Sequence, residues 1–284
     1  MKIFLTGGTG FIGTHFLRSP LAVGHEIVAL RRDGSRPCLP IPFEPTWIHR
    51  ALDAVTPDDL AGCDVLVHLA SPGVSPKKAS WNELFHWNVT ATLRLVEQAR
   101  LAGVRRVVVA GTFAEYGRSA DRFDPIPADA PLEPTYGYAA SKAASSVALS
   151  AYAIEYGMEL AYLRVFSAFG DGQYEANFWP ALRKAALSGE DFPMTQGGQV
   201  RDYLPVENVA AAFWRASIAV PLAAGRPCVA NIGSGRPVTM REFAEEWWAH
   251  FGATGHLLVG ALPYRPNEVM RFVPFIDPAS PFKP

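Results

Sequence analysis

An α/β fold is predicted by the order of patterns along the 284-residue chain, with a doubly wound, mostly parallel sheet and a smaller C-terminal lobe. Short runs rich in β-branched residues alternate with segments of helical length. Such alternation builds right-handed βαβ units and therefore a parallel sheet. From about residue 169, proline, glycine and aromatic residues become dense and strand-like runs become scarce, which indicates a second lobe.

The predicted elements follow from these patterns in chain order. The predicted strands are "KIFL", "EIVAL", "VLVHLA", "RRVVVA", "LAYLRVF" and "CVANIG", and the predicted helices lie at about 11–22, 88–102, 138–156 and 206–218. We predict a first domain over residues 1–168, to which residues 205–233 return with one helix and one strand. Residues 169–204 and 234–284 are predicted to form the smaller lobe, which would bind the substrate.

Composition limits the class of protein. Apolar residues make up 49% and charged residues 19%, as in an ordinary globular protein with a core. The net charge of −1 gives no electrostatic reason to expect nucleic acid or a membrane surface as a partner. Three scattered cysteines and the lack of a long apolar run favour a cytoplasmic protein. The seven histidines form neither HExxH nor an HxH cluster, so we expect no metal site.

A glycine turn follows the first predicted strand. In "TGGTGFIG", Gly7, Gly10 and Gly13 stand three residues apart and open the first helix. Glycines at this place let the backbone turn tightly and let a pyrophosphate approach the helix N-terminus. Three glycines can also simply close a surface loop, but the strand before and the amphipathic helix after favour a Rossmann-type dinucleotide site. Its predicted contacts are Gly7, Thr9, Gly10, Phe11, Ile12 and Gly13.

The end of the second predicted strand bears on the choice of cofactor. NAD enzymes usually place an acid here against the ribose hydroxyls, whereas this chain reads "IVALRRDG" with Arg31 at that position and Arg32 next to it. Arginine can pair with a 2′-phosphate, so the sequence favours NADP(H), with NAD(H) possible. The alternative is that both arginines are simply solvated on a loop.

A tyrosine and a lysine lie one helical turn apart in "TYGYAASKA". Tyr138 is four residues before Lys142, whereas Tyr136 has Ala140 at that spacing. A lysine beside a phenol stabilises the phenolate and lets the tyrosine move a proton at neutral pH. Thr112 follows a predicted strand at the carboxyl edge of the sheet, where it can hold the reacting oxygen. Tyrosine and lysine at this spacing often only line a surface, but their order after the glycine turn favours catalysis.

The chain resembles the extended short-chain dehydrogenase/reductase family, and within it the NAD-dependent epimerase/dehydratase group that works on nucleotide sugars. The matching pieces, which cover nearly the whole chain, are "TGGTGFIG", "DVLVHLA", "NVTATLRLVEQAR", "GTFAEYG", "YAASK" and "GGQVRDYLPVENVA". The resemblance implies that Thr112, Tyr138 and Lys142 are a catalytic trio and that Asn88 supports them from its helix.

The same resemblance implies further contacts. On the cofactor side, Tyr138 and Lys142 would border the nicotinamide and its ribose, and Asp53 would meet the adenine. The segment from His68 to Ser71 would pass beneath the dinucleotide, with contacts from Leu69, Ala70 and Ser71. On the substrate side, Thr112 would hold the reacting oxygen, Asn177 would lie near the nucleotide phosphates, and Arg201 and Arg265 would clamp diphosphate or ribose. Residues 71–87 would cover the sugar. Lys77 and Lys78 in this segment are either candidates for binding an anion or simply solvated on a loop.

Departures from the family pattern narrow the reaction. The sugar dehydratases carry Asp-Glu directly after the catalytic threonine, but this chain has Phe113 and Ala114, so 4,6-dehydration is not expected. With Arg31 in place of an acid, we expect an NADPH-dependent 4-ketoreductase of a nucleotide-linked 4-keto-6-deoxyhexose. The alternatives are an NAD-retaining nucleotide-sugar 4-epimerase and, less favoured, a non-catalytic dinucleotide sensor or scaffold. A homodimer through helices near 89–102 and 138–156 is expected from the family.

Overall fold

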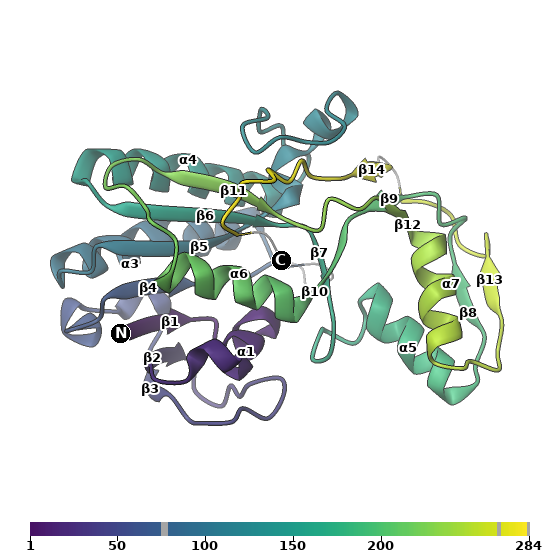
Figure 1. Cartoon of the computed structure of the whole chain (residues 1–284), viewed down its shortest axis with the longest axis horizontal. Helices are drawn as coiled ribbons and strands as arrows, with labels where there is room; N and C mark the ends of the chain where they lie inside the picture. The colour runs from purple at the N-terminus through teal and green to yellow at the C-terminus, as the bar shows by residue number, and fades with distance from the viewer. Residues whose placement is uncertain (75–78, 266–267, 283–284) are drawn as a thin grey trace.

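The computed structural model describes residues 1–74, 79–265 and 268–282. Its central feature is a seven-stranded sheet in which every neighbouring pair of strands is parallel (Figure 1). In spatial order the strands are β11 (Cys228–Ile232), β6 (Glu159–Val165), β5 (Arg106–Thr112), β4 (Val65–His68), β1 (Lys2–Thr6), β2 (Glu26–Arg31) and β3 (Thr46–His49). The order reverses between β1 and β4, and ligands bind at this kind of switch point in open α/β sheets.

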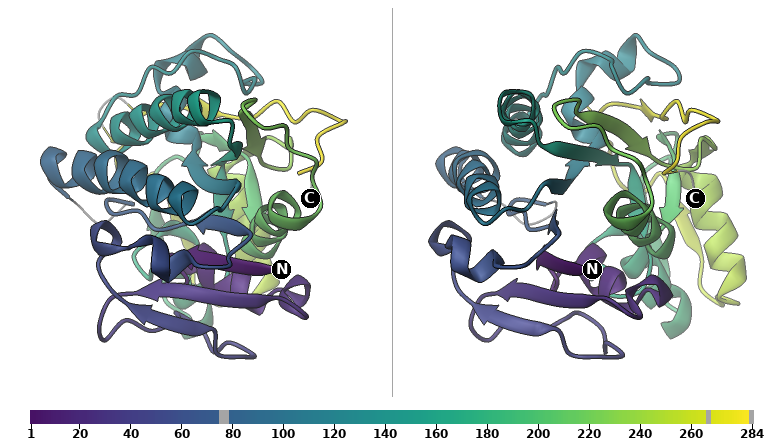
Figure 2. Two further views of the ribbon diagram at one scale, coloured as in Figure 1. Left: turned by 90° about the vertical axis from the view of Figure 1, so that its left-hand side faces the viewer. Right: turned by 60° about the vertical axis from the view of Figure 1, so that its left-hand side comes forward.

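Helices cover both faces of this sheet (Figure 2). One face carries α1 (Phe11–Arg18) and α6 (Val206–Ile218), and the other carries α3 (Ala91–Leu101) and α4 (Gly137–Tyr156). Alternate residues of β1 enter the two cores: Ile3 belongs to the apolar cluster that includes α1 and α6, and Phe4 to the cluster that includes α3 and α4. A strand buried on both faces is apolar along its whole length, which explains why the strands were visible as continuous apolar runs.

The predicted fold class is confirmed, and the six predicted strands and four predicted helices are present. Two local differences have clear causes. The first helix ends at Arg18, and a 3₁₀ turn beginning at Pro20 continues the predicted segment because proline cannot extend the helix. The edge strand β3 was not predicted, since its four residues lie half-exposed and show little alternation.

Short helical segments complete the larger domain. These are the 3₁₀ helices η1 (Pro20–Ala22), η2 (Leu52–Ala54), η3 (Pro57–Leu60), η5 (Phe113–Tyr116) and η6 (Arg118–Asp121), the α-helix α2 (Trp81–Phe85) and the π-helix η4 (His86–Thr90). The π-helix joins α2 to α3 in one continuous helical segment.

The C-terminal lobe lies to the right of the large sheet in Figure 1 and contains only short strands. Its helices are α5 (Phe178–Ser188) and α7 (Met240–His250), and its small sheets pair β13 (Leu257–Val259) with β8 (Phe192–Met194) and β12 (Val238–Thr239) with β9 (Val200–Arg201) and β14 (Arg271–Phe272). A further pair, β7 (Ser167–Phe169) and β10 (Tyr203–Pro205), lies between the two parts. Aromatic side chains make much of this core, including Phe178, Trp247 and Trp248.

The last described residues, which the sequence places with the smaller lobe, return to the large sheet. Phe282 is buried in the apolar cluster that contains Trp214 of α6, and its carbonyl accepts a hydrogen bond from Arg215. The last described residues therefore pack against the larger domain.

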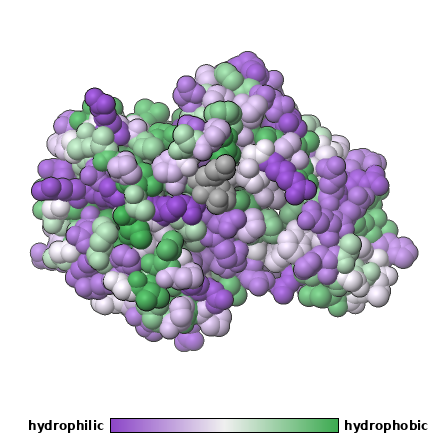
Figure 3. Space-filling view, viewed as in Figure 1, coloured by the Kyte–Doolittle hydropathy of each residue, from purple (hydrophilic) through white to green (hydrophobic). Residues whose placement is uncertain are grey.

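Among the described residues, no helix is long and apolar enough to cross a bilayer. Polar residues cover most of the face drawn in Figure 3, and apolar residues lie there in small separate groups.

Candidate active site

The glycine turn lies at the switch point of the sheet. Gly7 adopts a left-handed backbone conformation (φ +76°), and a Cβ atom there would come within 2.6 Å of the Ala70 nitrogen. A Cβ atom on Gly13 would overlap the Gly7 carbonyl group. Both positions therefore require glycine, because the turn packs directly against the segment that follows β4 and against its own helix.

The N-terminus of α1 fits a pyrophosphate group. Gly10, the residue before the first helical position, makes no side-chain cap, and the first turn carries no acidic residue. The N–H groups of Phe11 and Ile12 in the first turn have no partner within the helix, so an anion can take their hydrogen bonds. Ala70 lies beside this turn, as predicted for a segment that passes beneath a dinucleotide. The individual cofactor contacts remain predictions.

The predicted catalytic trio comes together from two elements. Thr112 is the last residue of β5, while Tyr138 and Lys142 lie in the first two turns of α4. The side chain of Tyr138 hydrogen-bonds with those of Thr112 and Ser71, and Lys142 is buried, with 3% of its surface exposed. The phenol therefore lies close to the predicted hydroxyl partner.

Asn88 connects the loop after β4 to α4. Its Oδ1 accepts a hydrogen bond from Ser71 Oγ (2.8 Å), and its Nδ2 donates one to Ser141 Oγ (2.9 Å). Ser141 Oγ in turn donates to the backbone carbonyl of Tyr138 (2.8 Å). Asn88 lies in the π-helix η4, and single π turns often occur at functional sites. The amide thus holds both Ser71 and the backbone of Tyr138.

Burial controls the electrostatics of the trio. It raises the pKa of Tyr138, and the nearby Tyr136 and Glu115 raise it further, while the hydrogen bonds with Ser71 and Thr112 lower it. The expectation that Lys142 lowers this pKa into the neutral range is therefore not met. Burial lowers the pKa of Lys142 to about 8, against the opposing effect of Glu115. Burial also lowers the pKa of His68 to about 3, helped by the charge of Lys142, so this imidazole is neutral at pH 7. Lys142 is therefore the cation at the centre of this site.

Replacing Lys142 by methionine is expected to stabilise the protein while removing its activity. The unfolded chain keeps the ordinary lysine pKa of 10.5, so it binds more protons than the folded chain between pH 8 and 10.5, and stability rises with pH across that window. Holding the ammonium thus costs the folded state roughly 3 kcal/mol below pH 8. We expect Lys142→Met to raise the free energy of unfolding by roughly 1 to 3 kcal/mol at pH 7. Urea unfolding at pH 7 and pH 10 tests this, and an equal gain at both values would contradict it.

Tyr136 is a neighbour of the trio that was not predicted as a site residue. Its ring centroid lies 6.4 Å from that of Tyr138, with 27° between the ring planes, and half of its surface is exposed. Burial raises the pKa of Tyr136, and the charge of Arg265 opposes this, so Arg265 is on the same side of the molecule as the trio. The sequence signal that could have placed Tyr136 near the trio was its position two residues before Tyr138.

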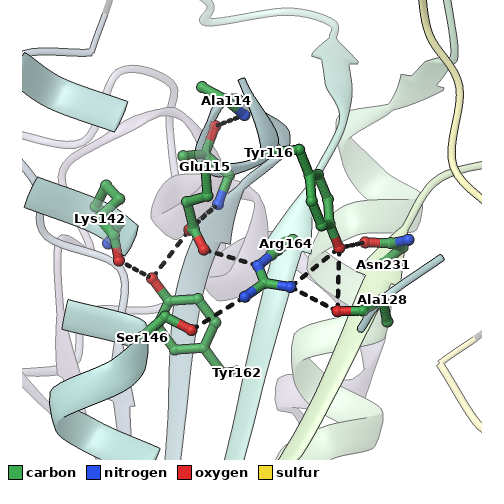
Figure 4. A network of polar contacts seen from close by, with 10 residues as sticks. Ala114, Glu115, Tyr116, Ala128, Lys142, Ser146, Tyr162, Arg164 and Asn231 are labelled. Atoms are coloured by element: carbon green, nitrogen blue, oxygen red, sulfur yellow. Dashed lines mark hydrogen bonds and ion pairs between the residues drawn. The ribbon is translucent and has the colours of Figure 1, made fainter. Parts of the chain in front are cut away.

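A buried ion pair beneath the trio was also not predicted. Glu115 Oε2 accepts a hydrogen bond from Arg164 Nε (2.7 Å), and both side chains are almost fully inaccessible to solvent (Figure 4). The available sequence signal was one charge inside each of the segments "GTFAEYG" and "LAYLRVF". Charges inside two neighbouring buried segments are usually paired.

Comparison with known proteins agrees with this geometry. A family model described as "NAD dependent epimerase/dehydratase family" matches residues 3–233, which is most of the chain. The chain belongs to the NAD-dependent epimerase/dehydratase family. The prediction of an NAD(P)-dependent oxidoreductase or epimerase of nucleotide sugars is thereby confirmed at the level of the family, whose model is described as NAD-dependent.

Relatives within the epimerase/dehydratase family are similar over most of their length. A UDP-glucose 4-epimerase of Corynebacterium glutamicum is 28% identical over 86% of this chain and 79% of its own. A UDP-glucose 4-epimerase of Mycolicibacterium smegmatis is 30% identical over 85% of this chain and 80% of its own. The solved structure of MoeE5 in complex with UDP-glucuronic acid and NAD is 28% identical, with a TM-score of 0.82 over 97% of this chain and 90% of that one.

The two positions that carry Asp-Glu in the family's dehydratases are apolar here. The ring of Phe113 packs against those of Phe166 and Phe272, at centroid distances of 5.5 and 4.9 Å. Ala114 is buried and donates its N–H to Thr112 Oγ1. Glu115 does not replace the missing carboxylates, because Arg164 holds it inside the protein.

The arginines after the second strand have different surroundings. Arg31 ends β2, donates from Nε to His49 Nε2 (3.0 Å), and places its guanidinium 4.6 Å from the centre of the Trp47 ring. Arg32 is exposed in the following turn. Asp33 lies close by and contacts His49 Nδ1 (2.8 Å). The family is NAD-dependent, and a preference of this chain for NADP(H) remains a prediction.

The remaining predicted residues lie outside the contacts of the trio. Asp53 is in η2 and contacts His86 Nε2 (3.4 Å), and Asn177 precedes the first turn of α5. Arg201 is largely engaged within the smaller lobe, where it bonds Glu268 Oε1 (3.3 Å) and the carbonyl of Val269 (2.9 Å). Their cofactor and substrate contacts stay predictions. Lys77 and Lys78 lie outside the described residues.

Proposed function

We propose that this protein moves a hydride at C4 of a nucleotide-linked sugar, with Tyr138 as the acid and base. The observation that supports this most directly is that the Tyr138 phenol lies close to Thr112 and Ser71, with a buried lysine one turn further along the same helix. A nucleotide sugar is the substrate class named for the relatives, and a nicotinamide dinucleotide fits the glycine turn at the switch point.

The roles of the residues follow from their positions. Thr112 Oγ1 holds the oxygen on the reacting carbon, and Tyr138 removes a proton from that oxygen during oxidation and returns it during reduction. The Lys142 ammonium stabilises the phenolate that forms in between. When bound, the nicotinamide accepts and returns the hydride. Asn88 and Ser71 keep the phenol oriented towards Thr112.

For the net reaction we propose 4-epimerisation first and reduction of a 4-keto sugar second. Epimerisation was our alternative from the sequence, and the names of the two curated relatives favour it. Reduction was our leading expectation, and it is favoured by Arg31 at the end of β2, where an acid would select NAD. Dehydration lacks the carboxylates that would expel water, because Phe113 and Ala114 occupy their positions.

One panel of substrates separates these reactions. The protein would be incubated with UDP-glucose, UDP-galactose, their N-acetylated forms and a nucleotide-linked 4-keto-6-deoxyhexose, each with NADH, NADPH or no added cofactor. Interconversion of C4 isomers without net change in absorbance at 340 nm supports the epimerase. Stoichiometric oxidation of NADPH by the 4-keto sugar supports the reductase. Neither reaction with any member of the panel would contradict the proposed function.

A preference for NADP(H) can be tested at Arg31. We propose that its guanidinium, held by His49 and Trp47, pairs with the 2′-phosphate. A lost charge-assisted contact of this kind costs about 1.5 to 3 kcal/mol, so Arg31→Ala should weaken NADP⁺ binding about 10- to 100-fold and leave NAD⁺ binding unchanged. Titration calorimetry measures both. Arg105→Ala is the matched control. Arg105 is exposed and directly precedes β5, so it lies at the amino-terminal ends of the strands, whereas Arg31 lies at a carboxyl end. Equal weakening of NAD⁺ and NADP⁺ binding would show that Arg31 does not read the phosphate.

We also propose that the protein forms a homodimer through α3 and α4. Leu101, Val147 and Ile154 on these helices each expose more than half of their surface. Apolar side chains of this size gain free energy when a second copy covers them. Light scattering would then give twice the 30.9 kDa mass of the chain.

A further inference from the structure

The Glu115 carboxylate reaches the backbone of the first catalytic residue. Its Oε1 accepts a hydrogen bond from the Thr112 N–H (2.8 Å), so the carboxylate closes the turn in which Thr112 Oγ1 accepts from Ala114. Glu115 is fully buried, and water does not compete for these bonds. The orientation of the Thr112 backbone is thus fixed by the Glu115 side chain in the protein interior.

The phenol of Tyr162 extends this contact to the second catalytic residue. Its O–H lies 3.0 Å from Glu115 Oε1 and 2.9 Å from the backbone carbonyl of Lys142 (Figure 4). The phenol has one proton for these two acceptors, so its O–H is shared between them and links the two groups. The bridge needs Gly111, because a Cβ atom there would overlap the Tyr162 ring and lie 2.9 Å from Glu115 Oε1. A continuous path of contacts therefore joins Thr112 on β5 to Lys142 on α4.

Arg164 compensates the buried negative charge of Glu115 and also hydrogen-bonds to helix α4. Besides Glu115, its guanidinium donates to Ser146 Oγ on α4 (3.2 Å), to the Tyr116 hydroxyl (3.0 Å) and to the Ala128 carbonyl (2.7 Å). With these partners almost all of its donors are used, as a buried cation requires. Helix α4 is consequently held from the sheet at two points one turn apart, Lys142 and Ser146.

We propose that Glu115 and Tyr162 are positioning residues, which set the distance between Thr112 on the sheet and Lys142 on α4 through the Thr112–Glu115–Tyr162–Lys142 path. The inference rests on the proposed function, since it assigns the path to the catalytic trio. The trio spans two separate elements, so nothing local to either one fixes their separation. A displacement of about 1 Å in such a site can cost about 100-fold in rate.

A pair of matched variants tests the path. Tyr162→Phe and Tyr116→Phe each remove one hydroxyl from a fully buried ring of the same network. Only Tyr162 contacts Lys142, whereas the Tyr116 hydroxyl donates to Asn231 Oδ1 (2.6 Å) on the far side of Arg164. We expect Tyr162→Phe to lower kcat about 10- to 100-fold with KM and cofactor affinity unchanged, and Tyr116→Phe to keep kcat within about twofold. Thermal unfolding would confirm that both variants are folded.

The variant Glu115→Gln tests how the charge of Glu115 affects Lys142. The negative charge of Glu115 raises the pKa of Lys142, which is about 8 in the folded protein. Its removal in Glu115→Gln should therefore move the alkaline limb of the pH–rate profile to a lower pH than in the wild-type protein. The limb should stay in place in Tyr116→Phe. If Glu115→Gln does not fold, the Tyr162→Phe comparison still decides.

The outcomes separate this inference from the proposed function. A Tyr138→Phe variant serves as the reference for loss of the proton donor. If it is inactive while Tyr162→Phe and Tyr116→Phe have equal kcat, the positioning path is wrong and the proposed function stands. If Tyr138→Phe keeps full turnover, the proposed function falls, and the inference falls with it.

Discussion

A Tyr138→Phe variant is expected to lose about 100- to 10,000-fold in kcat while it binds the dinucleotide as tightly as the wild-type protein. The change removes one oxygen atom and keeps the ring, which packs near Gly73 and Leu84. That oxygen is the group that hydrogen-bonds with Thr112 and Ser71, and it is the proton carrier of the proposed reaction. Steady-state kinetics with the best substrate of the panel, together with calorimetric titration of the cofactor, provide the measurement.

The control for this result lies on the same helix. Tyr152 also belongs to α4, but its hydroxyl accepts a hydrogen bond from Arg100, away from the trio. Tyr152→Phe should therefore leave kcat within about twofold, since it removes only a peripheral contact. A Tyr138→Phe variant that keeps more than a tenth of wild-type turnover would rule out the phenol as the proton donor.

The second large effect is expected at the buried ion pair. Arg164→Met would leave the Glu115 carboxylate inside the protein without its cation. Removing one partner of a buried pair typically costs about 3 to 5 kcal/mol, because the remaining charge is not compensated. We therefore expect the free energy of unfolding to fall by about that amount, as measured by urea unfolding at pH 7.

Two further variants show whether the uncompensated charge causes the loss. Arg164→Met combined with Glu115→Gln removes both charges and should recover a large part of the stability. Arg241→Met breaks an exposed pair with Glu245 that has the same 2.7 Å separation, and it should cost less than about 1 kcal/mol. Equal losses for Arg164→Met and Arg241→Met would mean that burial of the pair does not matter.

Much of the fold was predictable because its signals are local. Each strand of the central sheet except β3 is a short apolar run, and the turn "TGGTGFIG" follows the first of them directly. In a parallel sheet the carboxyl ends of neighbouring strands share one edge, so Thr112 at the end of β5 could be placed near the cofactor from its position alone. The contact between Tyr138 and Thr112 follows from that geometry.

The features that escaped prediction depend on tertiary contacts. The register of the sheet sets Gly111 opposite Arg164, and this leaves the space into which Glu115 and Tyr162 fit. No local pattern shows that these residues meet. The π turn at Asn88 also lies within a helical pattern that an ordinary α-helix would satisfy. Likewise, strands of two or three residues in the smaller lobe are too short to show a period.

The return of Phe282 to the α6 side of the sheet has a mechanical consequence. The stretch from β11 to this phenylalanine leaves the large sheet at Ile232 and is anchored to it again at its other end. This stretch is therefore a loop whose two ends are both held by the larger domain. Holding both ends of a loop reduces the conformational freedom of the residues between them. The backbone of Val273 and Phe275 also pairs with Ile126 of the larger domain, so α7 and β12 are tied to that domain on both sides, and the buried Phe282 reinforces the second tie.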